Sequence, residues 1–311
     1  MVSILFKAGA GDPAGWQREL SARIPDLDWR VWPDNVGDPA TVDFVLAFKV
    51  EPGFFAQFPN LKGVLATGAG VDGLFADPSL PTNLPIARIV DPYMTQQMVQ
   101  WTAYGVLHFF RRFDEYRTLQ DKADWQELGS PTRHANRVGV LGFGEIGGAI
   151  GRGLLALGFF VQGWTNTPRD LGPIDNFAGP DQLDAFLETS PFLVCTLPLT
   201  PDTKGLLNRE RLSKLPKGAV VLNLARGGHV VTDDLLALLN DGHLSGAVLD
   251  VADPEPLPAD HPLWSHPNVI ITPHESGLTT PATAADQIAA NVHRILAGEP
   301  VVNPVDVRRG Y

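Results

Sequence analysis

The stretch Arg137-Val-Gly-Val-Leu-Gly-Phe-Gly-Glu-Ile-Gly147 decides the fold. Its first five residues form an apolar run typical of a buried strand, and residues 145–157 continue as a helix-like segment. Between them Gly142 permits a tight turn, Gly144 lets a pyrophosphate approach the backbone, and Gly147 lets helix and strand pack closely. A helix N-terminus binds such an anion through its N–H groups and dipole. The stretch therefore predicts a dinucleotide site formed by Gly142, Gly144, Glu145, Ile146 and Gly147.

Apolar runs alternate with helical segments on both sides of this stretch. The strands expected before it are residues 3–6, 29–32, 44–48, 63–67 and 87–90. Those expected after it are residues 159–164, 192–197, 219–224, 247–251 and 269–272. Helices are expected at residues 14–23, 93–122, 233–239 and 282–296, with Thr232 as the N-cap of the third. Such alternation is typical of parallel α/β folds.

Two series of this kind in 311 residues predict two domains. We expect a Rossmann-type doubly wound parallel sheet inserted into a smaller flavodoxin-like α/β domain. The dinucleotide-binding domain is expected at residues 96–283. The smaller substrate (catalytic) domain is expected to be discontinuous, residues 1–95 plus 284–311, with the C-terminal tail returning to it.

Composition and charge exclude several classes of protein. A net charge of −11 argues against a broad grip on nucleic acid or on an anionic membrane. Cys195, the single cysteine, cannot form an internal disulfide and is expected to be buried in a strand. No apolar run reaches the ~18 residues of a membrane span, and residues 1–7 resemble a first strand rather than a signal peptide. We therefore expect a cytoplasmic protein without a metal site.

The tip of the second strand after the glycines informs the choice of cofactor. An NAD-binding unit usually carries an acidic residue there, which bonds the ribose 2′-hydroxyl. This chain has Thr165-Asn-Thr-Pro-Arg169 instead. The side chains of Thr165, Asn166, Thr167 and Arg169 could accept the 2′-phosphate of NADP(H), so NADP(H) is the preferred cofactor and NAD(H) remains an alternative.

Three further segments carry residues suited to reducing a 2-oxo acid: Asn223-Leu-Ala-Arg-Gly227, Asp250-Val-Ala-Asp-Pro-Glu-Pro256 and Thr272-Pro-His274. Arg226 and His274 follow expected strands, which places them at the ligand-binding edge of the sheet. Arginine can bind carboxylate and carbonyl, histidine can donate a proton near neutral pH, and a carboxylate such as Glu255 can stabilise the imidazolium. The histidines expected to be structural or exposed are His108, His134, His229, His243 and His293.

These motifs, with Gly68-Ala-Gly-Val-Asp72 and Pro262-Leu-Trp264, resemble the D-isomer-specific 2-hydroxyacid dehydrogenases over nearly the whole chain. The closest branch is the A-type glyoxylate/hydroxypyruvate reductases. The resemblance implies a homodimer that reduces glyoxylate or hydroxypyruvate with NADPH, and that closes its two domains around the substrate. In that reading Arg226 binds the substrate, His274 donates the proton and Glu255 supports the imidazolium.

The resemblance also implies further contacts. The amides of Ala69 and Gly70 would hold the substrate carboxylate, and Asp250 would contact the nicotinamide side. The remaining cofactor contacts would come from Leu197, Pro198, Ala225, Arg226, His274 and Ser276. Asn166 stands where the NADPH-preferring branch typically has arginine, and Arg169 is expected to compensate.

Three alternatives remain at this point. The first is an NADH-dependent dehydrogenase of another 2-hydroxy acid. Formate dehydrogenases are related enzymes, but that type has glutamine in place of the glutamate beside the histidine. Glu255 therefore counts against this alternative. The C-terminal binding protein corepressors share this fold and a similar triad, so a dinucleotide-sensing binding protein is the alternative from a different class. The compact length favours an enzyme.

Overall fold

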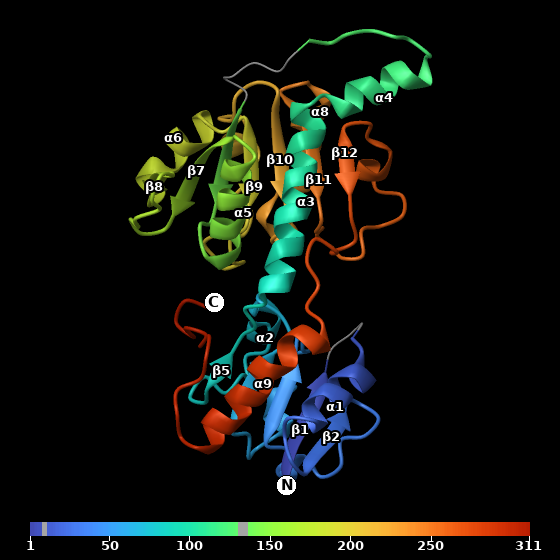
Figure 1. Ribbon diagram of the computed structural model, residues 1–311. Helices are drawn as coiled ribbons and strands as arrows, with labels where there is room; N and C mark the ends of the chain where they lie inside the picture. The colour runs from blue at the N-terminus through green and yellow to red at the C-terminus, as the bar shows by residue number, and fades with distance from the viewer. Residues whose placement is uncertain (8–10, 130–135) are drawn as a thin grey trace. The chain divides into compact units, whose positions relative to one another are not determined.

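The computed structural model describes residues 1–7, 11–129 and 136–311 (Figure 1). The chain forms two compact units, Met1–Met94 with Thr279–Tyr311, and Thr95–Leu278. Each unit is built on a sheet whose strand pairs are all parallel. The predicted α/β fold class is thereby confirmed.

The discontinuous unit carries a five-stranded sheet in the order β2-β1-β3-β4-β5, which is the flavodoxin-like order. The strands are β1 Val2–Lys7, β2 Leu27–Val31, β3 Phe44–Ala47, β4 Gly63–Ala66 and β5 Ile86–Ala87. Helices α1 (Pro13–Ser21) and α9 (Pro281–Leu296) lie side by side and bury one face of the sheet (Figure 1). Phe54, Phe55 and Phe58 belong to the core on the other face. With both faces covered, β3 and β4 are apolar and buried throughout.

The second unit carries a seven-stranded sheet in the order β12-β11-β10-β9-β6-β7-β8. The strands are β6 Arg137–Leu141, β7 Phe160–Thr165, β8 Asp175–Ala178, β9 Phe192–Cys195, β10 Ala219–Asn223, β11 Leu244–Leu249 and β12 Val269–Ile271. The chain builds outward from β6 through β7 to β8, then returns to β9 and builds in the opposite direction. The reversal between β6 and β9 is the topological switch point at which α/β sheets bind ligands.

Helices cover both faces of this sheet. They are α3 Pro92–Phe110, α5 Glu145–Ala156, α6 Leu183–Glu188, α7 Arg209–Leu212 and α8 Thr232–Asn240. On one face α3 packs closely against the sheet. Its Phe109 occupies the space that a side chain at Gly246 of β11 would need. On the other face α6 and α8 contribute to a core that includes Leu193 and Val221. Cys195 is fully buried in β9, as predicted, and burial raises the pKa of its thiol to about 12.

The prediction of one long helix over residues 93–122 is wrong. The segment forms two helices, α3 and α4 (Phe113–Asp121), separated at Arg112, whose φ of 60° is left-handed. The Arg112 guanidinium pairs with Glu115 and donates to the carbonyl of Leu128, which fixes the bend. All of α4 is described and none of it is buried, so no packing holds it in line with α3. Within the described residues, none of the helices has the length and apolarity needed to cross a bilayer.

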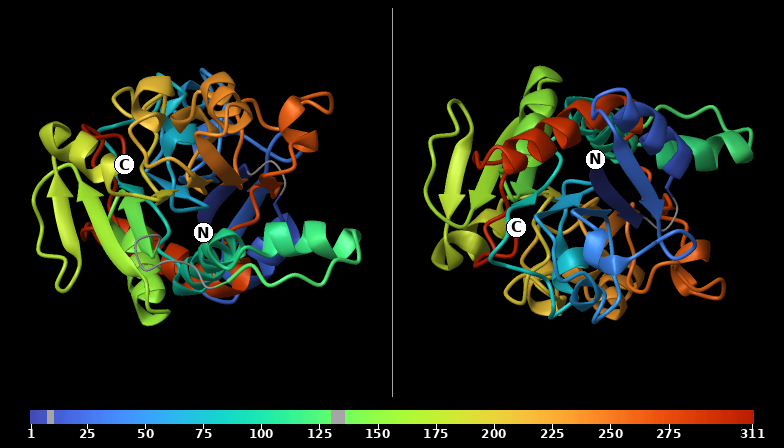
Figure 2. Two further views of the ribbon diagram at one scale, coloured as in Figure 1. Left: turned by 90° about the horizontal axis from the view of Figure 1, so that it is seen from above. Right: turned by 90° about the horizontal axis from the view of Figure 1, so that it is seen from below.

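Two smaller predictions also need correction. The strand β8, at the edge of the sheet (Figure 2), was not predicted. Its one large apolar residue, Phe177, follows the polar residues Asp175 and Asn176. The expected capping of α8 by Thr232 is wrong, since Thr232 is already helical and Val231 occupies the cap position without a side-chain bond. Thr232 instead lines a small cavity beside β10 and β11.

A buried carboxylate organises a loop in the discontinuous unit. Asp77 is 1% exposed and accepts the N–H groups of Gly53, Phe55 and Ser79 at 2.8–2.9 Å. Burial by itself raises the pKa of the Asp77 carboxyl, but these N–H groups and the Ser79 hydroxyl lower it by more, from 3.8 to about 2. The folded protein therefore favours the ionised form of Asp77.

We expect Asp77→Asn to lower the free energy of unfolding near neutral pH by about 2 kcal/mol, the equivalent of this pKa difference. Because the folded-state pKa is depressed, the contribution is present above about pH 4 and disappears as the pH falls towards about 2. Urea denaturation between pH 2.5 and 6 measures it, with the exposed Asp34→Asn as control. A difference between wild type and Asp77→Asn that stays constant over this range would contradict the account.

Candidate active site

The glycine-rich turn after β6 has the three local geometries that its motif predicts. Gly142 has a φ of +99°, which L-residues with a side chain rarely adopt. A Cβ at Gly147 would lie 2.0 Å from the carbonyl oxygen of Gly142, so helix and strand pack at backbone distance. A Cβ at Gly144 would meet nothing within 4 Å. The open backbone at Gly144, at the N-terminus of the 12-residue helix α5, fits the pyrophosphate of a dinucleotide.

The loop after β7 carries the residues expected to select the cofactor. Asn166, Thr167 and Arg169 are exposed. Thr165 is buried, and its hydroxyl lies 2.8 Å from the carbonyl oxygen of Thr167 and 3.1 Å from Oδ1 of Asn176. Thr165 therefore shapes the loop, and its direct contact with a cofactor stays a prediction.

Arg226 lies in a turn after β10 that is held from two sides. Within the turn, the Asn223 side chain accepts the N–H of Ala225 and donates to the carbonyl of Arg226 at 2.9 Å. The buried imidazole of His229 has its two nitrogens 3.0 Å from the carbonyl oxygen of Arg226 and 3.2 Å from that of Pro198. His229 thus links the Arg226 turn to Leu197–Pro198, the segment predicted to line the cofactor cleft.

Glu255 and His274 form a direct pair. Oε2 of Glu255 lies 3.1 Å from Nδ1 of His274, and Oε1 accepts the N–H of Ala252 at 3.0 Å. Burial raises the pKa of the Glu255 carboxyl, but the bonds from His274 and Ala252 and the charges of His274 and Arg226 lower it by more. Glu255 is therefore ionised near neutral pH, and its carboxylate faces Nδ1 of His274.

The turn that carries His274 is fixed by Asp250, at the end of β11. Oδ1 of this buried carboxylate accepts the Thr272 hydroxyl at 2.6 Å and the N–H groups of Glu275 and Ser276 at 2.7 and 3.0 Å. His274 itself has a φ of 61°, and its N–H donates to the carbonyl of Asp250 at 2.7 Å. The left-handed backbone at His274 is therefore held by bonds on both sides.

The predicted residues of this unit thus follow the carboxyl ends of β6, β7, β9, β10, β11 and β12. Ala225 and Ser276 are buried within the turns that carry Arg226 and His274. Ala69 and Gly70 lie in the other unit, in the loop between β4 and α2 (Asp72–Phe75), and their contact with substrate stays a prediction. His134 lies outside the described residues.

Sequence reasoning missed the residues that support the site. His229 was expected to be structural or exposed, and it is structural, but its link between two site segments was not predicted. The supporting role of Asp250 was also missed, as was that of Trp101, whose indole N–H donates to the Thr272 hydroxyl at 3.0 Å. The one available signal was proximity in the chain, since His229 and Thr272 lie within three residues of Arg226 and His274. In the described part of the chain no cluster of three or more His, Cys, Asp or Glu could hold a metal ion.

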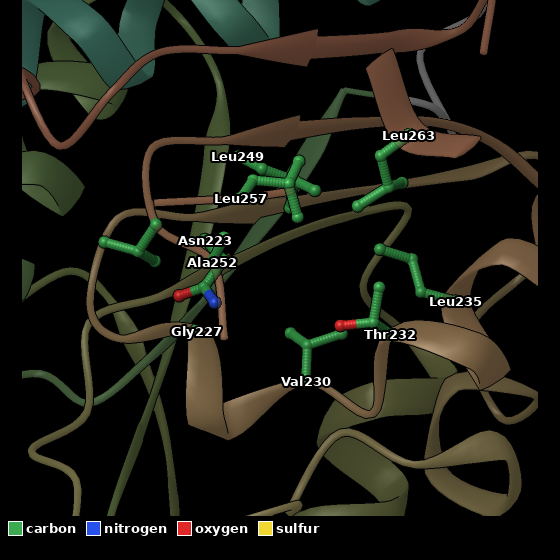
Figure 3. A pocket seen from close by; sticks show the side chains of 10 residues that line it. Asn223, Gly227, Val230, Thr232, Leu235, Leu249, Ala252, Leu257 and Leu263 are labelled. Carbon is green, nitrogen blue, oxygen red and sulfur yellow. The ribbon is translucent and has the colours of Figure 1, made fainter. Parts of the chain in front are cut away.

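A small cavity lies beside the Arg226 turn (Figure 3). Its walls are mainly apolar, from Leu235, Leu249, Leu257 and Leu263, with Asn223 and Thr232 as polar members. Its volume of about 20 Å³ has room for one water molecule. It is therefore too small for a substrate.

Comparison with known proteins gives consistent matches. Residues 104–276 match the family model "D-isomer specific 2-hydroxyacid dehydrogenase, NAD binding domain". Glyoxylate/hydroxypyruvate reductase A of Serratia proteamaculans is 41% identical over 315 residues, covering 100% of both chains. A D-isomer specific 2-hydroxyacid dehydrogenase from Xanthobacter autotrophicus, solved with NADPH and MES, superimposes with a TM-score of 0.94 at 43% identity, covering 100% of this chain and 99% of that one.

The NADPH-dependent glyoxylate/hydroxypyruvate reductase of Sinorhizobium meliloti, solved with NADP and sulfate, gives a TM-score of 0.92 at 32% identity. That match covers 100% of both chains.

Two adjacent glycines provide a matched test of how the site is packed. A Cβ at Gly227 would lie 2.0 Å from the backbone carbon of Ala252, in the loop that leads to Glu255. A Cβ at Gly228 would first meet the Leu199 side chain, at 3.3 Å. We expect Gly227→Ala to be less stable than Gly228→Ala by about 2 kcal/mol or more, because backbone must move. Equal stability in urea denaturation would refute this packing.

Proposed function

Since the chain belongs to the D-isomer-specific 2-hydroxyacid dehydrogenase family, we propose that it reduces glyoxylate and hydroxypyruvate to the 2-hydroxy acids with NADPH. The observation that carries the proposal is the His274–Glu255 pair at 3.1 Å. Glu255 follows β11 and His274 follows β12, and β11 lies next to β10, the strand that leads to Arg226. The full-length similarity to glyoxylate/hydroxypyruvate reductase A and to structures solved with NADPH or NADP supports the substrate and the cofactor.

The proposed chemistry gives each member of the triad a separate task. Arg226 binds the substrate carboxylate and orients the carbonyl through its planar guanidinium. Because Nδ1 of His274 faces the Glu255 carboxylate, Nε2 carries the proton that passes to the carbonyl oxygen. Glu255 supports the imidazolium through its contact with Nδ1 of His274. NADPH, when bound, supplies the hydride for the carbonyl carbon.

The proposal assigns dinucleotide binding to the unit Thr95–Leu278 and makes the other unit the substrate (catalytic) domain. The cofactor would be held by Gly142, Gly144, Glu145, Ile146, Gly147, Thr165, Asn166, Thr167, Arg169, Leu197, Pro198, Ala225, Arg226, Asp250, His274 and Ser276. Ala69 and Gly70 would bind substrate with Arg226 and His274. The open approach at Gly144 supports the first of these assignments.

We also propose that the protein is a homodimer of the cytoplasm. In support of the dimer, α4 buries none of its residues and projects beyond the sheet (Figure 1). Aromatic side chains gather around it, with Phe113 53% exposed and Trp125 99% exposed. Exposed apolar surface of this kind marks protein interfaces. The mass in solution, against 33.6 kDa for one chain, tests the dimer. The buried free thiol of Cys195 fits a reducing compartment.

Initial rates test the function directly. We expect faster oxidation of NADPH than of NADH, and faster turnover of glyoxylate and hydroxypyruvate than of pyruvate and phenylpyruvate. His274→Gln should lower kcat by about 100- to 10,000-fold, the usual effect of losing a general acid. The exposed His293→Gln serves as the control.

Near-normal turnover by His274→Gln would rule out the assigned proton donor. Absence of turnover with every cofactor and substrate pair would instead favour a dinucleotide-sensing binding protein.

The pH profile tests the role of Glu255. Glu255→Gln removes a negative charge 3.1 Å from Nδ1 of His274, so the alkaline limb of kcat/KM should move to lower pH. The shift should be small, because both side chains are partly exposed to solvent. Glu275→Gln, which removes an exposed carboxylate next to His274, should shift the limb less. Identical pH profiles of kcat/KM for Glu255→Gln and Glu275→Gln would count against a functional Glu255–His274 pair.

A further inference from the structure

Asn176 lies in the edge strand β8, and both the oxygen and the nitrogen of its side-chain amide contact the loop after β7. Its Oδ1 lies 3.1 Å from the hydroxyl of Thr165, where the loop begins, and shares that donor with the carbonyl oxygen of Thr167 at 2.8 Å. Its Nδ2 donates to the carbonyl of Arg169 at 2.6 Å, where the loop ends. One side chain therefore holds both ends of the segment 165–169.

The strand register explains why Asn176 can reach this loop. Asn176 pairs with Gly163 of β7, so the two residues share one face of the sheet. Gly163 has no side chain, and Leu171, just beyond the loop, lies 2.8 Å from where a Cβ would stand. The loop thus folds back over β7 and meets the Asn176 amide. Phe177, the next residue of β8, points the other way and packs against Phe186.

We propose that Asn176 is a positioning residue that sets the preference for NADPH over NADH by holding the 165–169 loop in the shape that receives the 2′-phosphate. The inference rests on the proposed function, because it concerns the cofactor of that site. Asn176 is not among the residues expected to touch the cofactor, and it acts through the backbone positions of the exposed residues Asn166, Thr167 and Arg169.

The physical reason is preorganisation. The side chains that would meet a 2′-phosphate are exposed, and ordering such a loop at the moment of binding costs conformational entropy. A loop that is already held at Thr165 and Arg169 loses less conformational entropy when the cofactor binds. The two bonds need an acceptor and a donor on one short side chain, which an asparagine amide supplies and an aspartate does not. NADH has no 2′-phosphate, so ordering of this loop adds little to its binding affinity.

Calorimetric titration of the enzyme with NADP⁺ and NAD⁺ tests the inference without turnover. We expect Asn176→Ala to weaken NADP⁺ binding by about tenfold, the scale of losing two modest hydrogen bonds, and to leave NAD⁺ binding within about twofold. Asn176→Asp should weaken NADP⁺ binding more. It keeps the acceptor, loses the donor to Arg169, and adds a negative charge on the side of the phosphate. The KM for NADPH should rise in parallel while kcat stays unchanged.

Asn136→Ala is the matched control. Asn136 is also a half-buried asparagine whose amide donates to a loop carbonyl, that of Gly158, at 2.9 Å, but it precedes β6 at the opposite end of the strands. A merely structural role for Asn176 would lower the melting temperature and leave the ratio of the two affinities unchanged, as in the control. An unchanged ratio in Asn176→Ala and Asn176→Asp therefore overturns the inference. If the wild-type enzyme binds neither dinucleotide, the proposed function fails and the inference fails with it.

Discussion

The buried carboxylate of Asp250 is the constraint on which the rest of the site depends. His274 needs a left-handed backbone, which costs an L-residue about 1–2 kcal/mol. The Thr272 hydroxyl and the N–H groups of Glu275 and Ser276 all converge on one oxygen of Asp250 and hold that turn. Trp101 extends the support into α3 through Thr272. The imidazole therefore meets Glu255 in a fixed orientation rather than as one rotamer among several.

The molecule combines a strongly negative total charge with a site for anions. At −11, the chain as a whole does not attract a 2-oxo acid or a dinucleotide phosphate. Local groups must therefore do so: the N-terminus of α5, the Arg226 guanidinium and the His274 side chain that pairs with Glu255. The parallel topology places these groups together, because they follow strands that end at the same edge of one sheet.

The parts of the fold that follow from local chemistry could be predicted, and those that depend on tertiary contacts could not. Buried parallel strands are largely apolar, so β6 and β10 could be predicted from the sequence, as could the glycines at 142, 144 and 147. The break at Arg112 depends on bonds to Glu115 and Leu128, which no helical periodicity contains. The triad was found because its residue types match a reaction. Asp250 and His229 support the turns that carry His274 and Arg226, and Asn176 supports the 165–169 loop, through bonds that only the folded chain shows.

The state of Cys195 has a practical consequence for watching this protein move. The thiolate is the form that alkylating reagents attack, and a buried thiol with a pKa of about 12 offers none of it near neutral pH. The native chain therefore does not react with maleimides, and Cys195 need not be replaced before the protein is labelled. A single cysteine introduced on the surface of each unit would accept a dye or a spin label cleanly. Distances between two such labels, measured with and without cofactor and substrate, would then report whether the two units move relative to each other.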